Sequence, residues 1–173
     1  TLSFTGDALS VTDTDFALAS SIEFLQTANG NNRITLGASA QAAGIASIQG
    51  GTGRDTLSAA GFTGNVTLIS GTDKTAALLG DSLIGGVGAD SLVGSDKADV
   101  LNGGAGIDTM EGGLGNDTYY IGDDGDWAIE GVNSGANLLI VDQNVSTFNT
   151  VSGGGTTSFS IQGLVSIQGN TGD

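Results

Sequence analysis

Residues 85–120 divide without remainder into four nonapeptides, GGVGADSLV, GSDKADVLN, GGAGIDTME and GGLGNDTYY. An aspartate occupies position 6 of every unit, so Asp90, Asp99, Asp108 and Asp117 recur at intervals of nine residues. Position 1 is always glycine, and an apolar or aromatic residue always follows the aspartate by two positions. A fixed period of this kind predicts short parallel strands joined by tight turns, an all-β parallel β-roll or β-solenoid.

The nine-residue period also has a geometric consequence for the aspartates. A six-residue turn and a three-residue strand make half a coil, so two nonapeptides complete one coil and residues 18 apart lie above one another. Neighbouring strands are ~4.8 Å apart, and Ca²⁺ takes oxygen ligands at roughly 2.3–2.6 Å, so one ion fits between two stacked turns. The 18-residue separation holds for the pairs Asp81/Asp99, Asp99/Asp117 and Asp90/Asp108. The sequence therefore predicts two columns of calcium sites on opposite edges of the stack.

The energetics of such a stack favour metal-dependent folding. Glycine in the turns costs backbone entropy, roughly 0.5–1 kcal/mol per residue, and strands of three residues bury little apolar surface. Two carboxylates ~4.8 Å apart also repel by about 3 kcal/mol at an effective dielectric constant near 20. We therefore expect the block to be loose without calcium and ordered with it.

These residues resemble the RTX (repeats-in-toxin) nonapeptide family of secreted bacterial proteins, most strongly over 85–120 and at GGTGRDTLS, residues 50–58. The resemblance implies that each ion takes the aspartate and the carbonyl oxygens of positions 1 and 3 of one turn. The next turn supplies the carbonyl oxygens of positions 2 and 4 and its own aspartate. The implied ligand sets are Gly85, Val87 and Asp90 with Gly104, Gly106 and Asp108, and Gly94, Asp96 and Asp99 with Gly113, Gly115 and Asp117.

The second nonapeptide departs from this pattern. Ser95 and Lys97 stand where the other three units have glycine. A site between Asp81 and Asp99 would use this turn, so it is the site that the departure affects.

Upstream of the block the register changes. Asp55 lies 18 residues before Asp73, which predicts one more calcium site, but Asp73 and Asp81 are separated by eight residues rather than nine. We therefore expect a jog in the solenoid near residues 76–80. Residues 59–67 have the length of a repeat, with Gly64 at the place of the aspartate.

The chain divides into three parts on this basis. Residues 1–49 are predicted to form degenerate solenoid coils without calcium, with a single helical turn or a bulging loop over 38–46. Residues 50–120 are the calcium-binding block. Residues 121–173 are predicted to be a β-rich continuation, and because VSIQGNTGD at the end repeats ASIQGGTGRD at 46–55, we expect the chain to be cut from a longer repetitive protein.

Three further acidic residues follow the block. Asp123, Asp124 and Asp126 form either another cation loop or an acidic turn surface. No Glu stands twelve residues after the first aspartate as an EF-hand requires, so the turn surface is the favoured interpretation.

Composition narrows the partners and the chemistry. With 19 acidic against 4 basic residues the formal net charge is −15, so nucleic acid and anionic membranes are poor partners, and cations are good ones. No apolar run is long enough to insert into a membrane. Histidine and cysteine are absent, which removes disulfides, thiol nucleophiles and imidazole bases, and we expect no enzyme activity. The chain starts at Thr1 and shows no signal peptide, which indicates a processed chain or a fragment.

Three classes of function remain open. The first, which we favour, is a calcium-bound structural module of a secreted or cell-surface protein, such as an adhesin, surface layer, sheath or filament, with calcium and neighbouring repeats or further copies as partners. The second is the calcium-triggered folding and secretion module of an exported enzyme or toxin. The third is an ice-binding solenoid. The third needs a regular Thr or Asn ladder, and the residues that follow the four aspartates are Ser91, Val100, Thr109 and Thr118, which is irregular.

Overall fold

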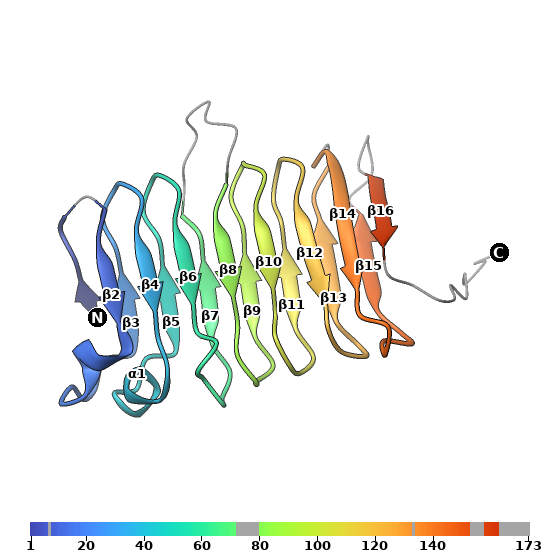
Figure 1. Ribbon diagram of the computed structural model, residues 1–173. Helices are drawn as coiled ribbons and strands as arrows, with labels where there is room; N and C mark the ends of the chain where they lie inside the picture. Colours follow the sequence, from blue (N-terminus) through green and yellow to red (C-terminus); the bar gives the residue numbers. More distant parts are fainter. Residues whose placement is uncertain (7, 72–79, 133, 153–157, 163–173) are drawn as a thin grey trace.

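The structure, a computed structural model, describes residues 1–6, 8–71, 80–132 and 134–152, and the backbone of 158–162. Over these residues the chain winds into a parallel β-solenoid in which successive strands alternate between two parallel sheets (Figure 1). The predicted all-β fold with short strands joined by turns is therefore confirmed.

The odd-numbered strands form one eight-stranded sheet in the described part of the chain, here called the odd sheet. Its strands are β1 (Leu2–Ser3), β3 (Phe24–Gln26), β5 (Ser47–Gln49), β7 (Thr67–Ile69), β9 (Ser91–Val93), β11 (Thr109–Glu111), β13 (Trp127–Glu130) and β15 (Asn149–Ser152). The even-numbered strands form a second eight-stranded sheet, the even sheet. Its strands are β2 (Ser10–Thr12), β4 (Arg33–Thr35), β6 (Thr56–Ser58), β8 (Ser82–Ile84), β10 (Val100–Asn102), β12 (Thr118–Ile121), β14 (Ala136–Val141) and β16 (Ser158–Gln162).

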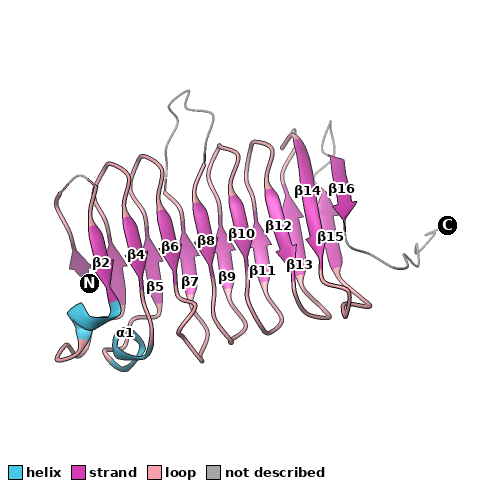
Figure 2. Ribbon diagram, in the orientation of Figure 1, coloured by secondary structure: helices cyan, strands magenta, loops and turns pink. Residues whose placement is uncertain are grey.

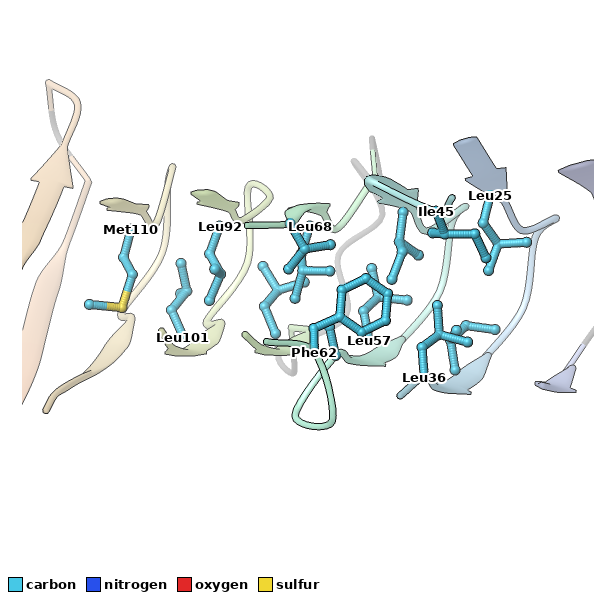
Figure 3. Close-up of a cluster of buried hydrophobic side chains, with 14 of the residues drawn as sticks. Leu25, Leu36, Ile45, Leu57, Phe62, Leu68, Leu92, Leu101 and Met110 are labelled. Atoms are coloured by element: carbon cyan, nitrogen blue, oxygen red, sulfur yellow. The ribbon is translucent and has the colours of Figure 1, made fainter. Parts of the chain in front are cut away.

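The core lies between the two sheets and is one side chain wide in each strand. Because side chains alternate along a strand, a three-residue strand sends its central residue inward and its two flanking residues outward. Leu25, Leu68, Leu92 and Met110 of the odd sheet thus face the inward residues of the even sheet, among them Leu57 and Leu101, and all are buried (Figure 3). The apolar residue two places after each aspartate is therefore the core residue of its strand.

The helical content is confined to the N-terminal coils (Figure 2). A 3₁₀ turn, η1 (Asp13–Phe16), and one short helix, α1 (Ala38–Ala42), are the helical elements of the described residues. Asp13 caps α1, because its Oδ1 atom accepts hydrogen bonds from the backbone N–H groups of Gly37 and Ala40, both at 2.8 Å. The segment 38–46 is thus helical at its start. No helix in the described ranges has the length and apolar character needed to cross a membrane.

The stacking offset equals 18 residues inside the nonapeptide block and differs outside it. Val100 pairs with Ser82 on one side and Thr118 on the other, which is the expected two-nonapeptide coil. Upstream, Thr56 pairs with Ser82, so one coil is longer, and the extra residues enter between β7 and β8. The jog expected near 76–80 falls largely on residues outside those described. The sheets keep their register because the added length is taken up in a turn.

Candidate metal centre

The position-6 aspartates form a hydrogen-bonded ladder along one edge of the solenoid. The Oδ1 atom of Asp99 accepts the backbone N–H of Asp81 at 2.5 Å, and the Oδ1 atom of Asp117 accepts that of Asp99 at 2.7 Å. We call this the even ladder because each aspartate precedes an even strand. It continues upstream, where the Oδ1 atom of Asp81 accepts the N–H of Asp55 at 2.6 Å.

A second ladder, the odd ladder, runs along the opposite edge. Asp90 accepts the N–H of Val66 at 2.8 Å, Asp108 accepts that of Asp90 at 2.8 Å, and Asp126 accepts that of Asp108 at 3.0 Å, each through Oδ1. All the aspartates of both ladders are buried. The structure therefore brings together the three pairs that were predicted from their 18-residue spacing.

The second carboxylate oxygen folds back onto the turn that carries it. The Oδ2 atom of Asp90 accepts the N–H of Gly86 at 2.6 Å, and that of Asp99 accepts the N–H of Ser95 at 2.5 Å. The aspartate at position 6 thus closes its own six-residue turn with one oxygen and holds the preceding coil with the other. This double role requires a side chain with two acceptor oxygens and a short stem.

Glycine at position 1 is required by close packing. A Cβ atom on Gly85 would lie 2.5 Å from Asp90 Oδ2 and 2.1 Å from the carbonyl oxygen of Gly103 in the next coil. On Gly94 the corresponding distances are 2.6 Å to Asp99 Oδ2 and 2.3 Å to the carbonyl oxygen of Gly112. The backbone, the carboxylate and the carbonyl of the next turn therefore occupy all the space at this position.

Glycine at positions 2 and 4 has a conformational role in the third and fourth nonapeptides. Gly104, Gly106, Gly113 and Gly115 all have positive φ, between 97° and 124°, which side chains disfavour. A Cβ on any of them would also lie within 2.3 Å of a carbonyl oxygen of the preceding coil. Ser95 and Lys97 are absent from the described residues with positive φ, so the second turn has a different backbone path.

Burial and mutual repulsion make the ladders electrostatically demanding. Burial, together with the charges of neighbouring carboxylates, raises the pKa of Asp81 to about 7, of Asp108 to about 6 and of Asp117 to about 8. The pKa of Asp99 is raised by burial as well, although hydrogen bonds and the positive charge of Lys97 oppose the rise. A bound cation would remove the cost of keeping these groups ionised at neutral pH.

The donor set fits a hard cation. The Oδ2 atoms of Asp108 and Asp117 are buried and have no hydrogen-bond partner, so each has a free lone pair at the turn. Carboxylate and carbonyl oxygens are the ligands that Ca²⁺ prefers. No group of three or more His, Cys, Asp or Glu side chains in the described part could hold a metal by itself. Backbone carbonyl oxygens would have to complete the coordination, as in the ligand sets that the resemblance implies.

The residues of those ligand sets occupy the stacked turns that precede β9 to β12. Gly85, Val87 and Asp90 belong to the turn beneath the one that carries Gly104, Gly106 and Asp108, and Gly94, Asp96 and Asp99 lie beneath Gly113, Gly115 and Asp117. Val87 and Asp96 lie at turn surfaces, where their side chains are exposed. Their participation as ligands therefore concerns their carbonyl oxygens.

Asp55 stacks differently from the expectation. Its neighbour in the next coil is Asp81, 26 residues on. The expected partner, Asp73, lies outside the described residues. The cause is the longer turn between β7 and β8, which shifts the offset from 18 residues.

The ladders also contain residues that sequence reasoning missed. Asp126 continues the odd ladder, and its position 18 residues after Asp108 was the available signal. Asn32 and Asn137 end the even ladder: Asn32 Oδ1 accepts the N–H of Leu9 at 3.0 Å, and Asn137 Oδ1 accepts that of Asp117 at 2.7 Å. Val66, rather than Gly64, holds the aspartate position in its turn.

Comparison with known proteins gives one family. The profile of the RTX calcium-binding nonapeptide repeat (4 copies) matches residues 43–61, 84–119 and 93–127. No curated protein and no solved structure matches the chain. The matched residues include Asp55, the four aspartates of the nonapeptide block and Asp126. Residues 43–61 and 84–127 are therefore RTX calcium-binding nonapeptide repeats, a type of repeat that binds Ca²⁺ and occurs in secreted bacterial proteins.

Proposed function

We propose that this chain is a calcium-dependent structural segment, a stiff rod, of a secreted or cell-surface bacterial protein such as an adhesin, surface layer, sheath or filament. The observation that carries the proposal is the continuity of the two sheets. Strands β1 to β5, which precede the first full motif, belong to the same sheets as the repeats, and so do β14 to β16 after them. A rod of eight stacked strands extends roughly 35 Å at ~4.8 Å per strand.

Calcium would control when the rod forms. In this proposal the ions lie between the stacked turns of residues 50–120, held by the ladder aspartates and turn carbonyl oxygens, and Asp126 extends this block. Residues 1–49 and 121–173 are its β-solenoid flanks. Calcium is scarce inside cells and abundant outside them, so the chain would fold after export. We assign no catalytic step to it, because the buried carboxylates face one another along the ladders.

Solution scattering tests the rod. Small-angle X-ray scattering in calcium should give the profile of an elongated, rigid particle, and removal of calcium by a chelator should increase the radius of gyration as the chain expands. A compact globular profile in calcium would contradict the proposal. Antibody labelling of intact cells of the source bacterium, compared with the culture medium, then distinguishes a surface-attached rod from a released one.

The second candidate is a folding and secretion module for an exported enzyme or toxin. It is favoured by the block from β8 to β12, where the 18-residue register is uninterrupted and the calcium-type turns are concentrated. A fusion of the chain to an unrelated passenger enzyme separates the two functions. A secretion module should accelerate refolding of the passenger when calcium is added, whereas a structural rod should fold beside a passenger whose refolding rate does not change.

A further inference from the structure

The even ladder ends in a cluster that does not follow the nonapeptide pattern. In the coil after Asp117, the place of the position-1 glycine is taken by Glu130, 18 residues after Gly112, at the end of β13. Glu130 is 2% exposed and Asp117 is 1% exposed. Two carboxylates are therefore enclosed at the point where the acidic ladder stops.

Tyr119 orients Glu130. It occupies the inward position of β12, and its hydroxyl donates a hydrogen bond to Glu130 Oε1 at 2.5 Å and lies 3.2 Å from the carbonyl oxygen of Ile129. With Oε1 engaged in this way, Glu130 Oε2 is buried and has no hydrogen-bond partner. The aromatic side chain in this repeat thus fixes one carboxylate oxygen and leaves the other free to bind a ligand.

Asp117 contributes a second free oxygen to the same place. Its Oδ1 atom accepts the N–H of Asp99, while its Oδ2 atom is buried without a partner. A Cβ on Gly112 would meet the Tyr119 hydroxyl at 2.2 Å and Asp117 Oδ2 at 2.4 Å, so these two groups lie against the same Cα atom. The negative charge of Glu130 is, after burial, among the causes that raise the pKa of Asp117, which agrees with their proximity.

We propose that Asp117 and Glu130 hold an additional divalent cation of the hard, oxygen-binding class to which Ca²⁺ belongs, at the C-terminal end of the even ladder. Two unpartnered carboxylate oxygens inside a fold cost several kcal/mol unless a counter-charge meets them. Oxygen ligands of this type select Ca²⁺ over softer metals. Tyr119 acts as a positioning residue, and Asn137 closes the ladder beyond the site without adding charge.

The competing arrangement is a proton shared between the two carboxyl groups. A proton would also relieve their repulsion, and it would need no coordination shell. The two arrangements differ in the number of ions bound and in the protonation state of the carboxyl groups when calcium is saturating.

Ion counting by native mass spectrometry at neutral pH tests the site in the whole chain. Glu130→Gln should bind one calcium ion fewer than the unmodified protein, because a neutral amide replaces a ligand of nearly equal size. The matched control is Glu111→Gln, since Glu111 lies on β11 of the same sheet with its side chain exposed, and the count should not change. An unchanged count in Glu130→Gln overturns the proposal.

Infrared spectroscopy of the unmodified protein gives a second test that no folding defect of a variant affects. In saturating calcium at neutral pH the protonated-carboxyl band should be absent, because both groups are ionised ligands. A persistent protonated-carboxyl band would overturn the proposal in favour of the shared proton. Asp99→Ala should lose ions from the ladder in either case, so failure of this one site leaves the calcium-dependent rod standing.

Discussion

Single atoms decide which residues the turns of this solenoid tolerate. The position-1 glycines are confined by a carboxylate of their own turn and a carbonyl oxygen of the next coil, whereas other glycines have room around them. Gly94 illustrates the first case, and Gly131, with no atom within 4 Å of an added Cβ, illustrates the second. Identical substitutions should therefore have very different effects.

Gly94→Ala should destabilise the calcium-bound fold by about 1–3 kcal/mol, the range expected when a methyl group is forced into packed structure. The added methyl displaces Asp99 Oδ2 or the Gly112 carbonyl oxygen, so calcium affinity should fall as well. Urea unfolding in saturating calcium measures the stability change. Gly131→Ala is the control and should change stability by less than about 0.5 kcal/mol; equal effects of the two variants would show that packing at position 1 is not limiting.

The raised pKa values of the ladder aspartates predict an inverse pH dependence for the calcium-free chain. The folded state holds Asp81, Asp108 and Asp117 with pKa values of about 7, 6 and 8, above the usual 3.8. The folded state therefore binds more protons than the unfolded state between these limits, and unfolding free energy falls as pH rises. This stabilisation is fully present below about pH 4 and is lost through pH 6–8.

Circular dichroism of metal-stripped protein should therefore show more β structure at about pH 5 than at about pH 9. Asp117→Asn should reduce the difference, because the amide keeps the shape of the side chain without titrating. Greater β content at the alkaline end would contradict the assignment. With calcium present the trend should reverse, since protons then compete with the metal for the same oxygens.

At the scale of the strand and its turn, a ladder position is defined by how many charged neighbours it has. Asp99 lies between Asp81 and Asp117, whereas Asp90 has Asp108 on one side and Val66 on the other. Asp124 belongs to neither ladder. Its exposed carboxylate accepts the backbone N–H groups of Ser146 and Thr147 at a turn surface.

Alanine substitutions of these three residues should therefore remove different numbers of ions. Asp99→Ala should disturb up to two sites, Asp90→Ala mainly one and Asp124→Ala none, as counted by native mass spectrometry. Lys97 already places a positive charge near Asp99, and if it takes the place of the ion between Asp81 and Asp99, the effects of Asp99→Ala and Asp90→Ala become equal. A loss in Asp124→Ala as large as that in Asp99→Ala would show that the acidic residues bind ions as a diffuse surface.

The period of nine was sufficient to predict the strands, their inward residues and the three stacked aspartate pairs of the regular block. It could not predict the neighbour of Asp55, because the offset depends on turn length and the turn between β7 and β8 is long. Asp126 escaped attention because Ile121 and Asp124 replace glycine in its turn. Asn32 and Asn137 were missed for another reason: a search for carboxylates does not find the amides that make the same Oδ1 hydrogen bond.

The whole molecule shares one core, so its folding should be cooperative. Inward residues from Val11 to Leu139 form a single buried cluster that passes through the calcium block without interruption. The coils on either side of the block therefore gain their packing partners only when the block is ordered, as in other stacked architectures.

A calcium titration should give one transition for the whole chain, with a midpoint in the ~0.1–1 mM range of extracellular modules. Far-ultraviolet circular dichroism and the fluorescence of Trp127, on β13, should share that midpoint. Magnesium should substitute poorly, since it prefers a smaller octahedral shell and retains its waters. Full β structure in excess chelator, or two separate midpoints, would contradict coupled folding.

Alternation of strands between the two sheets also restricts how such a gene can change in length. Duplication or loss of a single nonapeptide would move every later strand to the opposite sheet, so each outward residue would exchange faces and each aspartate would join the other ladder. Duplication of two nonapeptides preserves both. Viable length variants of this protein should therefore differ within the block by multiples of 54 nucleotides, the coding length of one 18-residue coil, while turns such as the one between β7 and β8 accept insertions of any whole number of codons.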